Sequence, residues 1–376
     1  MSDTRIDFLY LSEPDMVAAG VTDMGACMDT MEEMFSVIGQ GDYRMAGSNA
    51  ASHGAMVGFP EHPVFPGMPH HTEDRRFMAM PAYLGGAFRM AGVKWYGSNI
   101  ENKASGLPRS IHLFVLNDTD TGAPVALMSA NLLSAMRTGA IPGVGARHFA
   151  PADAEVVGLV GPGVMARTAL ESFVVARPGL RKVKVKGRSS RGERAFADWV
   201  AATLPQLEVE IVDSNEAAVR DADIVTYCTT SGGAKSNYPA IEKSWVKPGA
   251  FLAMPSSLAP DDALMGEGVR KLVDHRKLYE AWAEEFPYPT YDEIPIIGCH
   301  FTDLVHDGLM KEEEIEDIGL LLHAGEARRR DEDEIVLFSI GGMPVEDVAW
   351  ATRCVATARE KGLGVPLNLW DSPVLA

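Results

Sequence analysis

The sequence is poor in cysteine, in basic residues and in long apolar runs. Its four cysteines lie far apart, with no C-x-x-C pair and no histidine at metal-ligand spacing, so we expect neither a disulfide framework nor a metal site. Lys and Arg number 34 against 52 Asp and Glu, a formal net charge of −18, which argues against general affinity for nucleic acid or anionic membranes. No stretch resembles a signal peptide or a membrane span. These absences favour a cytoplasmic protein without nucleic acid or membrane as partners.

The 376 residues, 46% of them hydrophobic, are enough for two domains with a sizeable core. From about 153 to 275 apolar strand patterns alternate with helical ones, which is typical of a parallel, doubly wound α/β sheet. The elements expected there are strands at 155–160, 182–186, 208–212, 223–228, 250–254 and 271–273 and helices at 164–176, 191–204 and 215–220. Elsewhere we expect strands at 76–83, 88–96, 110–118, 124–128 and 335–339 and a helix at 344–361. The charge runs 311–317 and 328–334 indicate solvated surface.

A glycine-rich turn follows the first strand of the doubly wound region. Gly161 and Gly163 stand in the pattern G-x-G-x-x-A, directly after an apolar strand and directly before a helical stretch. Gly161 permits a tight turn, Gly163 allows the backbone to approach a pyrophosphate, and Ala166 allows helix and strand to pack closely. The amide groups at the helix start favour an anion. The sequence therefore predicts a dinucleotide site whose first part is Gly161, Pro162, Gly163, Val164, Met165 and Ala166.

The end of the second strand of such a fold distinguishes NAD from NADP. An NAD site has an acidic residue there that binds the ribose 2′-hydroxyl, and this chain has none. Instead the segment 181–194 holds seven basic residues against one acid, Glu193, and reverses the sign of the global charge. Because guanidinium groups bind phosphate through paired hydrogen bonds, we expect NADP(H) in preference to NAD(H), with an ordinary exposed basic turn as the alternative. The predicted contacts are Gly187, Arg188, Ser189 and Arg191.

The fourth strand of this region ends in Tyr227-Cys228-Thr229-Thr230, at the edge of the sheet where nucleotides bind. Thr229 and Thr230 are therefore expected to line the cofactor site. Cys228 has no evident base, so we expect a small buried apolar residue there rather than a nucleophile.

Two basic residues stand in apolar surroundings before the dinucleotide motif. Lys94 lies in the middle of an apolar strand pattern, and Arg137 lies in a helical stretch of small and apolar residues. A buried cation requires an anion, because an unpaired charge inside a protein is costly. A substrate carboxylate is one candidate partner, and a structural ion pair with acidic residues of the chain is the other.

Several phrases, in order along the chain, resemble the ornithine cyclodeaminase/mu-crystallin family. They are G-V-K-W around Lys94, G-L-P at Gly106, L-N-D-T-D-T-G-A-P-V-A-L-M from Leu116, A-M-R-T-G-A around Arg137, G-L-V-G-P-G-V-M-A, D-A-D-I-V-T at Asp221, W-V-K-P-G-A at Trp245 and V-L-F-S-I-G-G-M-P-V-E-D from Val336. The resemblance covers residues from about 75 to 360. It implies a homodimer with a Rossmann-type NAD(P)-binding domain at 133–324 and a mixed α+β domain for dimerisation and substrate binding, built from 1–132 and 325–376.

The same resemblance implies a substrate site. The residues that match Lys94 and Arg137 hold the substrate carboxylate in the family, and an arginine near Arg44 adds a contact. The shared step is hydride transfer between the nicotinamide and the α-carbon of an amino or imino acid. Lys94 is also our candidate for proton transfer, because burial beside Arg137 would lower its pKa.

Two departures from the family pattern argue against ornithine as the substrate. Ser257 stands in place of an aspartate that binds the side-chain amine of the substrate, and Asp261 or Asp262 would reach that place only after a shift. Met78 stands in place of an orienting glutamate, and an apolar side chain leaves a substrate ammonium unpaired. We expect Met78 to contact the substrate and Ser257 to contact the cofactor.

The sequence as a whole predicts an NADP-linked imino-acid reductase or amino-acid dehydrogenase. Residues near Lys94 in the sequence favour an apolar or aromatic substrate side chain; they are Met78, Phe88, Trp95 and Tyr96. One alternative is a cyclodeaminase-type lyase that recycles NAD, with Asp261 or Asp262 entering the pocket. The other is a non-enzymatic, NADPH-dependent binding protein. The long loop at 47–71 is expected to cover the site.

Overall fold

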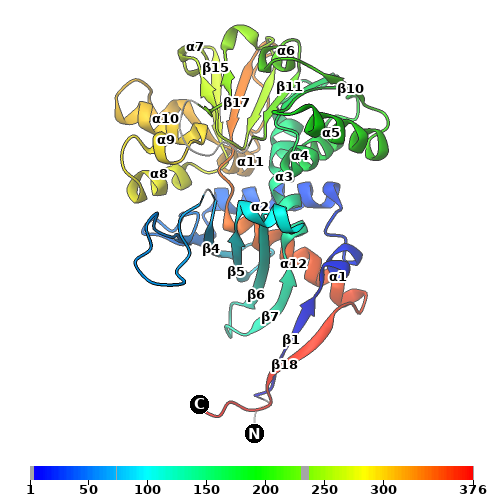
Figure 1. The fold of residues 1–376 in the computed structure, drawn as a ribbon, viewed down its shortest axis with the longest axis vertical. Coiled ribbons are helices and arrows are strands. Elements are labelled where there is room, and N and C mark those ends of the chain that lie inside the picture. Colours follow the sequence, from blue (N-terminus) through cyan, green and yellow to red (C-terminus); the bar gives the residue numbers. More distant parts are fainter. Residues whose placement is uncertain (1–3, 73, 230–236, 376) are drawn as a thin grey trace. The chain divides into compact units, whose positions relative to one another are not determined.

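The computed structural model describes residues 4–72, 74–229 and 237–375. The chain divides into two compact units (Figure 1). The first unit comprises residues 1–23, 41–137 and 343–376, and the second comprises 24–40 and 138–342. Residues 24–40 and 325–342 therefore group with the second unit, whereas the boundaries expected from the sequence assign them to the first. Residues 133–137 group with the first unit, whereas the expected boundaries assign them to the second.

The first unit contains an eight-stranded sheet in the order β18-β1-β7-β6-β5-β4-β2, with β3 paired to β4. Its strands are β1 (Ile6–Leu11), β2 (Tyr43–Met45), β3 (Ala55–Val57), β4 (Arg76–Leu84), β5 (Met90–Ser98), β6 (Ser110–Asp118), β7 (Pro124–Ser129) and β18 (Val365–Trp370). Strands β4 to β7 form an antiparallel meander, and the two ends of the chain lie side by side where β1 pairs with β18 (Figure 1). The strands predicted from 76 to 128 are confirmed to within two residues.

Helix α12 (Pro344–Glu360) packs across β4, β5 and β6 and covers one face of this sheet. Trp350 of α12 donates its indole N–H to the carbonyl of Val21 at 3.1 Å, which ties the helix to the N-terminal segment. In that segment α1 (Glu13–Ala18) begins at the N-cap Ser12 and has a proline in its first turn. Because side chains alternate along a strand, the other face of the sheet carries a separate set of residues.

The second unit contains a parallel sheet in the order β10-β9-β8-β11-β13-β17-β15-β16. Its strands are β8 (Val156–Val160), β9 (Lys182–Lys186), β10 (Glu208–Ile211), β11 (Ile224–Tyr227), β13 (Phe251–Met254), β15 (Val269–Val273), β16 (Ile315–Asp317) and β17 (Ile335–Ser339). The strand order reverses between β8 and β11, which confirms the predicted doubly wound α/β fold. Strand β17 pairs with β13 and β15, so a segment late in the sequence lies inside this sheet. A small separate pair is formed by β12 (Ala240–Ile241) and β14 (Ala259–Pro260).

The helices of the second unit are α2 (Met24–Gln40), α4 (Val164–Ala176), α5 (Ser190–Thr203), α6 (Asn215–Val219), α7 (Asp262–Met265), α8 (Arg276–Glu285), α9 (Thr290–Glu293), α10 (Ile297–His306) and α11 (Ile318–Ala324). Helix α3 (Asn131–Phe149) begins in the first unit and continues in the second. The 3-10 turns are η1 (Ile100–Ser105), η3 (Lys243–Trp245) and η4 (Glu312–Glu314). In the described ranges, no helix has the length and apolarity needed to span a bilayer.

The charge run 311–317 is not wholly solvated surface, so that prediction is wrong at its C-terminal end. Residues 315–317 form the edge strand β16, and Asp317 is buried. Its carboxylate lies 2.9 Å from His275 Nδ1 and accepts the backbone N–H of Gly319 at 2.8 Å, which caps α11. The acidic residue is retained in the interior because these partners offset its desolvation.

Candidate active site

Four charged side chains form a buried cluster in the first unit. Lys94 Nζ lies 2.8 Å from Asp347 Oδ2, and it also donates to Ser134 Oγ at 3.2 Å. Arg137 donates through Nε to Asp347 Oδ1 at 3.2 Å and through Nη1 to Glu346. Lys94 and Arg137 are 2% and 5% exposed, and both carboxylates are fully buried. Asp347 therefore bridges the two cations.

Three elements bring these groups together. Lys94 lies at the centre of β5 on the face that α12 covers, and Arg137 lies on α3. Glu346 and Asp347 occupy the first turn of α12, where the helix dipole favours negative charge. Glu346 also accepts the backbone N–H of Met343 at 2.8 Å, so its carboxylate caps the helix as well as pairing with Arg137.

The ion-pair alternative for Lys94 and Arg137 is present in the structure. Two cations face two carboxylates, so the cluster balances its own charge without a substrate. Some N–H donors of the cluster nevertheless remain available for a further hydrogen bond. Lys94 donates two of its three N–H groups, and Arg137 Nη2 makes no hydrogen bond with a described residue. The site can therefore still accept an anion from two adjacent cationic donors.

Burial and neighbouring charges shift the pKa values in this cluster. Burial lowers the pKa of Lys94 to about 8, assisted by Arg137 and opposed by Asp347, which confirms the lowering expected from the sequence. For Arg137 burial acts in the same direction, but Asp347 and Glu346 outweigh it and raise the pKa above its usual value. For Asp347 burial favours the neutral form, yet the two cations lower the pKa overall. Near neutral pH the cluster thus holds two cations and an ionised Asp347.

His112 on β6 lies on the same face of the sheet as Lys94. Its ring centroid is 4.7 Å from that of Tyr96, and the Tyr96 ring is 5.9 Å from Lys94 Nζ. Burial, together with the charge of Lys94, lowers the pKa of His112 to about 4, so the imidazole is neutral at physiological pH. Its buried Nδ1 has no hydrogen-bond partner in the described part of the chain.

The remaining predicted substrate contacts divide between the two faces of the sheet. Met78 pairs with Tyr96 and lies on the Lys94 face of the sheet. Arg44 pairs with Tyr83, whose side chain points away from the Lys94 face of the sheet, because side chains alternate along β4. The side chain of Arg44 is exposed and donates to the carbonyl of Tyr43. The expectation that Arg44 joins Lys94 and Arg137 is therefore wrong.

Two aromatic residues assigned to the substrate side also lie elsewhere. Trp95 is on the outer face of the sheet, 45% exposed and stacked on Phe77. Phe88 is buried, and the guanidinium of Arg353 lies over its ring. Of the four residues used to predict an apolar substrate, only Met78 and Tyr96 stand near the cluster.

In the second unit the glycine-rich turn has the features that a dinucleotide requires. Gly161 has φ +91°, and a Cβ there would come within 2.8 Å of the Cys228 backbone and 2.9 Å of Thr229. Gly163 is the N-cap of α4, has open space beside its Cα and has no side-chain cap. The first amide groups of α4 are therefore free to bind a pyrophosphate. Ala166 is fully buried, as expected for the close contact of helix and strand.

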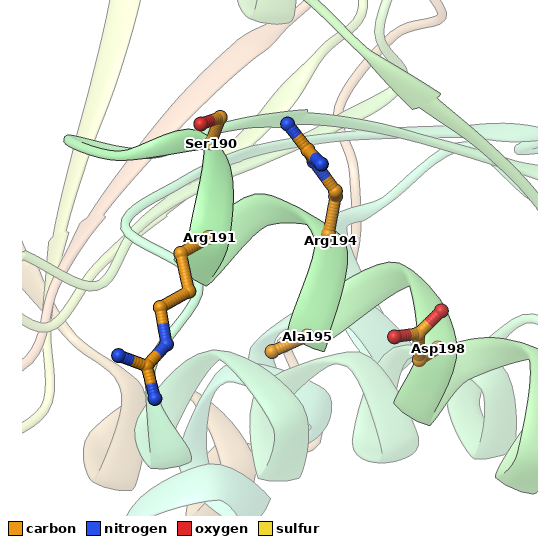
Figure 2. Close-up of a pocket in the computed structure, with 5 residues that line it drawn as sticks. All are labelled: Ser190, Arg191, Arg194, Ala195 and Asp198. Atoms are coloured by element: carbon orange, nitrogen blue, oxygen red, sulfur yellow. The ribbon is translucent and has the colours of Figure 1, made fainter.

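The turn after β9 joins this glycine-rich turn. The N–H of Gly161 donates to the carbonyl of Lys186 at 2.8 Å. Arg188, Ser189 and Arg191 are exposed at the start of α5. A hollow beside α5 is lined by Ser190, Arg191, Arg194, Ala195 and Asp198, with the two guanidinium groups extending in different directions (Figure 2). None of Arg188, Arg191 and Arg194 forms an ion pair with a described residue.

At the ends of β11 and β13, hydrogen bonds join the two strand ends. Thr229 donates its N–H to Ser256 Oγ at 3.1 Å, and Ser256 in turn donates to the carbonyl of Tyr227. Ser256 and its sequence neighbour Ser257 are both buried, and the predicted contact of Ser257 with the cofactor stays a prediction. The predicted contact Thr230 lies outside the described residues. Burial raises the pKa of the Cys228 thiol to about 12, which agrees with a structural role.

The two acids reserved for lyase chemistry have other positions. Asp261 is the N-cap of α7, and its Oδ1 accepts the N–H groups of Leu264 and Lys243, each at 3.0 Å. Asp262 is exposed on the first turn of the same helix.

Sequence reasoning missed the two acids that complete the cluster. Glu346 and Asp347 belong to the V-E-D phrase, which follows Gly-Gly-Met-Pro and precedes a helix with an apolar face. Two acids in the first turn of a helix are common as dipole partners, so their position alone does not signal a site. The signal available was their place in a phrase that also contributes to the family resemblance.

Together, these features define an α/β protein with a Rossmann-type dinucleotide-binding unit and a second unit that carries a buried lysine–arginine–carboxylate cluster. Residues 20–362 match the ornithine cyclodeaminase/mu-crystallin family, and the chain belongs to this family.

Three relatives illustrate the similarity. N-((2S)-2-amino-2-carboxyethyl)-L-glutamate dehydrogenase of Staphylococcus aureus is 25% identical, over 97% of this chain and 99% of the relative. The structure of Thermococcus litoralis Delta(1)-pyrroline-2-carboxylate reductase in complex with NADH and L-proline superposes with a TM-score of 0.76 at 23% identity, covering 95% of this chain and 99% of that chain. An archaeal alanine dehydrogenase dimer with bound NAD gives 0.76 at 21% identity, covering 97% and 100%.

Proposed function

We propose that this protein is an NADP(H)-dependent oxidoreductase that reduces an imino acid, or oxidises the matching α-amino acid. The observation that carries the proposal is the pair of adjacent buried cations, Lys94 and Arg137, with N–H groups still free for a carboxylate. Relatives named as dehydrogenases and reductases of amino or imino acids support this choice of substrate class. A dinucleotide-binding fold in the same chain supports hydride transfer as the reaction.

In the proposed reduction the substrate carboxylate binds the free N–H groups of Lys94 and Arg137. When bound, NADPH would supply a hydride for the α-carbon of the C=N group, and the nitrogen of that group would take up a proton. Lys94 is the candidate donor of that proton, because its lowered pKa of about 8 lies near the operating pH. Asp347 positions both cations through its two carboxylate oxygens. Because His112 is neutral, the positive charge of the site lies on Lys94 and Arg137.

A substrate panel tests this proposal. The purified protein is incubated with cyclic and linear imino acids, and with α-keto acids plus amines, while NADPH and NADH oxidation are followed in parallel. Turnover with at least one imino acid is expected. Tight NADPH binding without turnover of any member would favour a binding protein, and release of ammonia from ornithine would favour the lyase. The capping role of Asp261 argues against the latter.

The preference for NADP(H) over NAD(H) is part of the proposal. It is supported by the three exposed arginines around the start of α5 that have no acidic partner among the described residues. A ribose 2′-phosphate would provide these guanidinium groups with a negatively charged partner and with hydrogen-bond acceptors.

The double variant Arg188→Ala/Arg191→Ala is expected to raise the KM for NADPH by at least about 100-fold, since it removes two charge-assisted hydrogen bonds that are each worth roughly 1.5–3 kcal/mol. The KM for NADH should stay within about twofold, because NADH has no 2′-phosphate. Steady-state kinetics with both cofactors measure this. Arg181→Ala is the matched control: it removes a basic residue from the same segment that pairs with Glu155 instead. Equal losses for both cofactors would contradict the preference.

We also propose a homodimer formed through the outer face of the first sheet. This face exposes a continuous apolar patch, made of Phe77, Trp95, Ile111 and Leu113, which are 41–51% exposed. The patch lines a groove together with Phe59 and Pro69. We propose that a second copy of the chain covers this patch, because one apolar sheet face can pack against another and the dimeric archaeal relative has the same fold.

Leu113→Glu is expected to convert the dimer into a monomer, because it places a charge in the centre of the patch. Sedimentation velocity or light scattering measures the mass in solution. Leu309→Glu is the matched control, since Leu309 is 74% exposed but lies in the second unit. A wild-type protein that sediments as a monomer, or a Leu113→Glu variant that remains dimeric, would contradict this interface.

A cytoplasmic location completes the proposal. All four cysteines are free and buried, and none is placed to form a disulfide. Such cysteine usage suits a reducing compartment.

A further inference from the structure

The single acid of the basic segment 181–194 is buried. Glu193, in the first turns of α5, is 6% exposed, and its Oε1 accepts the backbone N–H of Gly187 at 2.9 Å. Lys186 Nζ lies 3.4 Å from the same oxygen. Burying a carboxylate is costly unless it is paired and hydrogen-bonded, and here the partners are the last residue of β9 and the first residue of the turn that follows it. The acid therefore acts on that turn.

Gly187 is packed tightly between two neighbours. A Cβ at Gly187 would come within 2.9 Å of Glu193 Cγ and 3.0 Å of Pro162 Cγ. Pro162 belongs to the glycine-rich turn, which is already joined to Lys186 by the N–H of Gly161. The side chain of Glu193 thus fixes the turn after β9 at the point where it meets the expected pyrophosphate site.

The next residues of this turn are the exposed candidates for the 2′-phosphate. Arg188 and Ser189 follow Gly187 directly, and Ser189 is the N-cap of α5, accepting the N–H of Gly192 at 3.3 Å. Helix α5 therefore holds the turn from both ends, through Glu193 at Gly187 and through Ser189 at Gly192. Arg188 lies between these two attachments, so the backbone that carries it is constrained on both sides.

We propose that Glu193 is a positioning residue for cofactor selection. By accepting the N–H of Gly187, it keeps the turn in the conformation that presents Arg188 and Ser189 to the 2′-phosphate of NADP(H). The inference rests on the proposed preference for NADP(H). Lys186 Nζ lies 3.4 Å from Glu193 and offsets its charge, so the carboxylate does not repel the cofactor. Removing the acid would leave the buried N–H of Gly187 without an acceptor.

Binding of two nucleotide fragments to the whole protein tests the inference. Titration calorimetry with 2′,5′-ADP and with 5′-AMP separates recognition of the 2′-phosphate from recognition of the adenosine. Glu193→Ala is expected to weaken 2′,5′-ADP about tenfold and 5′-AMP by less than about twofold. Glu193→Gln keeps an acceptor for Gly187 and should stay within about threefold of wild type for both. Thermal unfolding of each variant is recorded alongside.

The outcomes separate the two proposals. Wild-type protein that binds 2′,5′-ADP no more tightly than 5′-AMP would overturn the cofactor preference. Wild-type protein with the preference, together with a Glu193→Ala variant that keeps it in full, would overturn the role of Glu193. Equal weakening of both fragments would also overturn it, as would tighter binding of 2′,5′-ADP by Glu193→Gln. Should the alanine variant not fold, Glu193→Asp replaces it in the test. Its side chain is one methylene shorter, so the carboxylate lies farther from the N–H of Gly187, and we expect the same selective loss of 2′,5′-ADP binding.

Discussion

Replacing Lys94 with methionine is expected to lower kcat/KM for imino-acid reduction about a thousandfold, with little change in NADPH binding. Methionine keeps most of the side-chain volume on β5 but removes the ammonium that contacts Asp347 and faces the proposed carboxylate site. The loss combines one charge-assisted hydrogen bond to the substrate with the proton donor. Steady-state kinetics with the best substrate of the panel, and NADPH titration in parallel, measure the two quantities.

The same substitution also has a structural cost that must be separated from the catalytic one. Without Lys94, the buried Asp347 keeps only Arg137, and breaking a buried pair typically costs about 3–5 kcal/mol. The double variant Lys94→Met/Asp347→Asn removes both charges and is expected to recover much of the thermal stability while remaining inactive. Activity that returned together with stability in the double variant would contradict a catalytic role for Lys94.

Individual cations of the site were predictable from the sequence, because each is anomalous in its local context. Lys94 interrupts an apolar strand and Arg137 an apolar helix, so burial of a charge was visible within a few residues. Their partner was not visible in the same way. Asp347 lies 253 residues from Lys94 in sequence, and only the packing of α12 on the sheet brings them together.

Errors arose where local pattern does not determine position in a sheet. Arg44 lies in a strand of three residues, too short for alternation to reveal a face, and its pairing with Tyr83 decides the outcome. The apolar pattern of residues 335–339 predicts a strand, but nothing in it says that this strand pairs with β13 and β15. Trp95 neighbours Lys94 in the sequence, which favours a place on the substrate side, but adjacent residues of a strand point to opposite faces.

The pH dependence of the reaction follows from the same lysine. Burial lowers the pKa of Lys94 to about 8, so the ammonium form predominates below this pH and is lost above it. The proposed reduction needs the ammonium, both to hold the carboxylate and to donate a proton. We therefore expect kcat/KM to be level below about pH 8 and to fall about tenfold per pH unit above it, so that roughly a hundredfold is lost by about pH 10.

A comparison of kcat with kcat/KM sharpens this prediction. A bound carboxylate favours the charged form of Lys94, so the pKa that governs kcat in the substrate complex should lie higher than the pKa that governs kcat/KM. Lys94→Arg is the control, because a guanidinium stays protonated, and any residual activity of this variant should show no break near pH 8. The pKa of the free imino acid is measured separately, and its contribution to the pH profile of kcat/KM is removed. A wild-type profile that rises through pH 8 would mean that neutral Lys94 is the active form and would contradict its assignment as the proton donor.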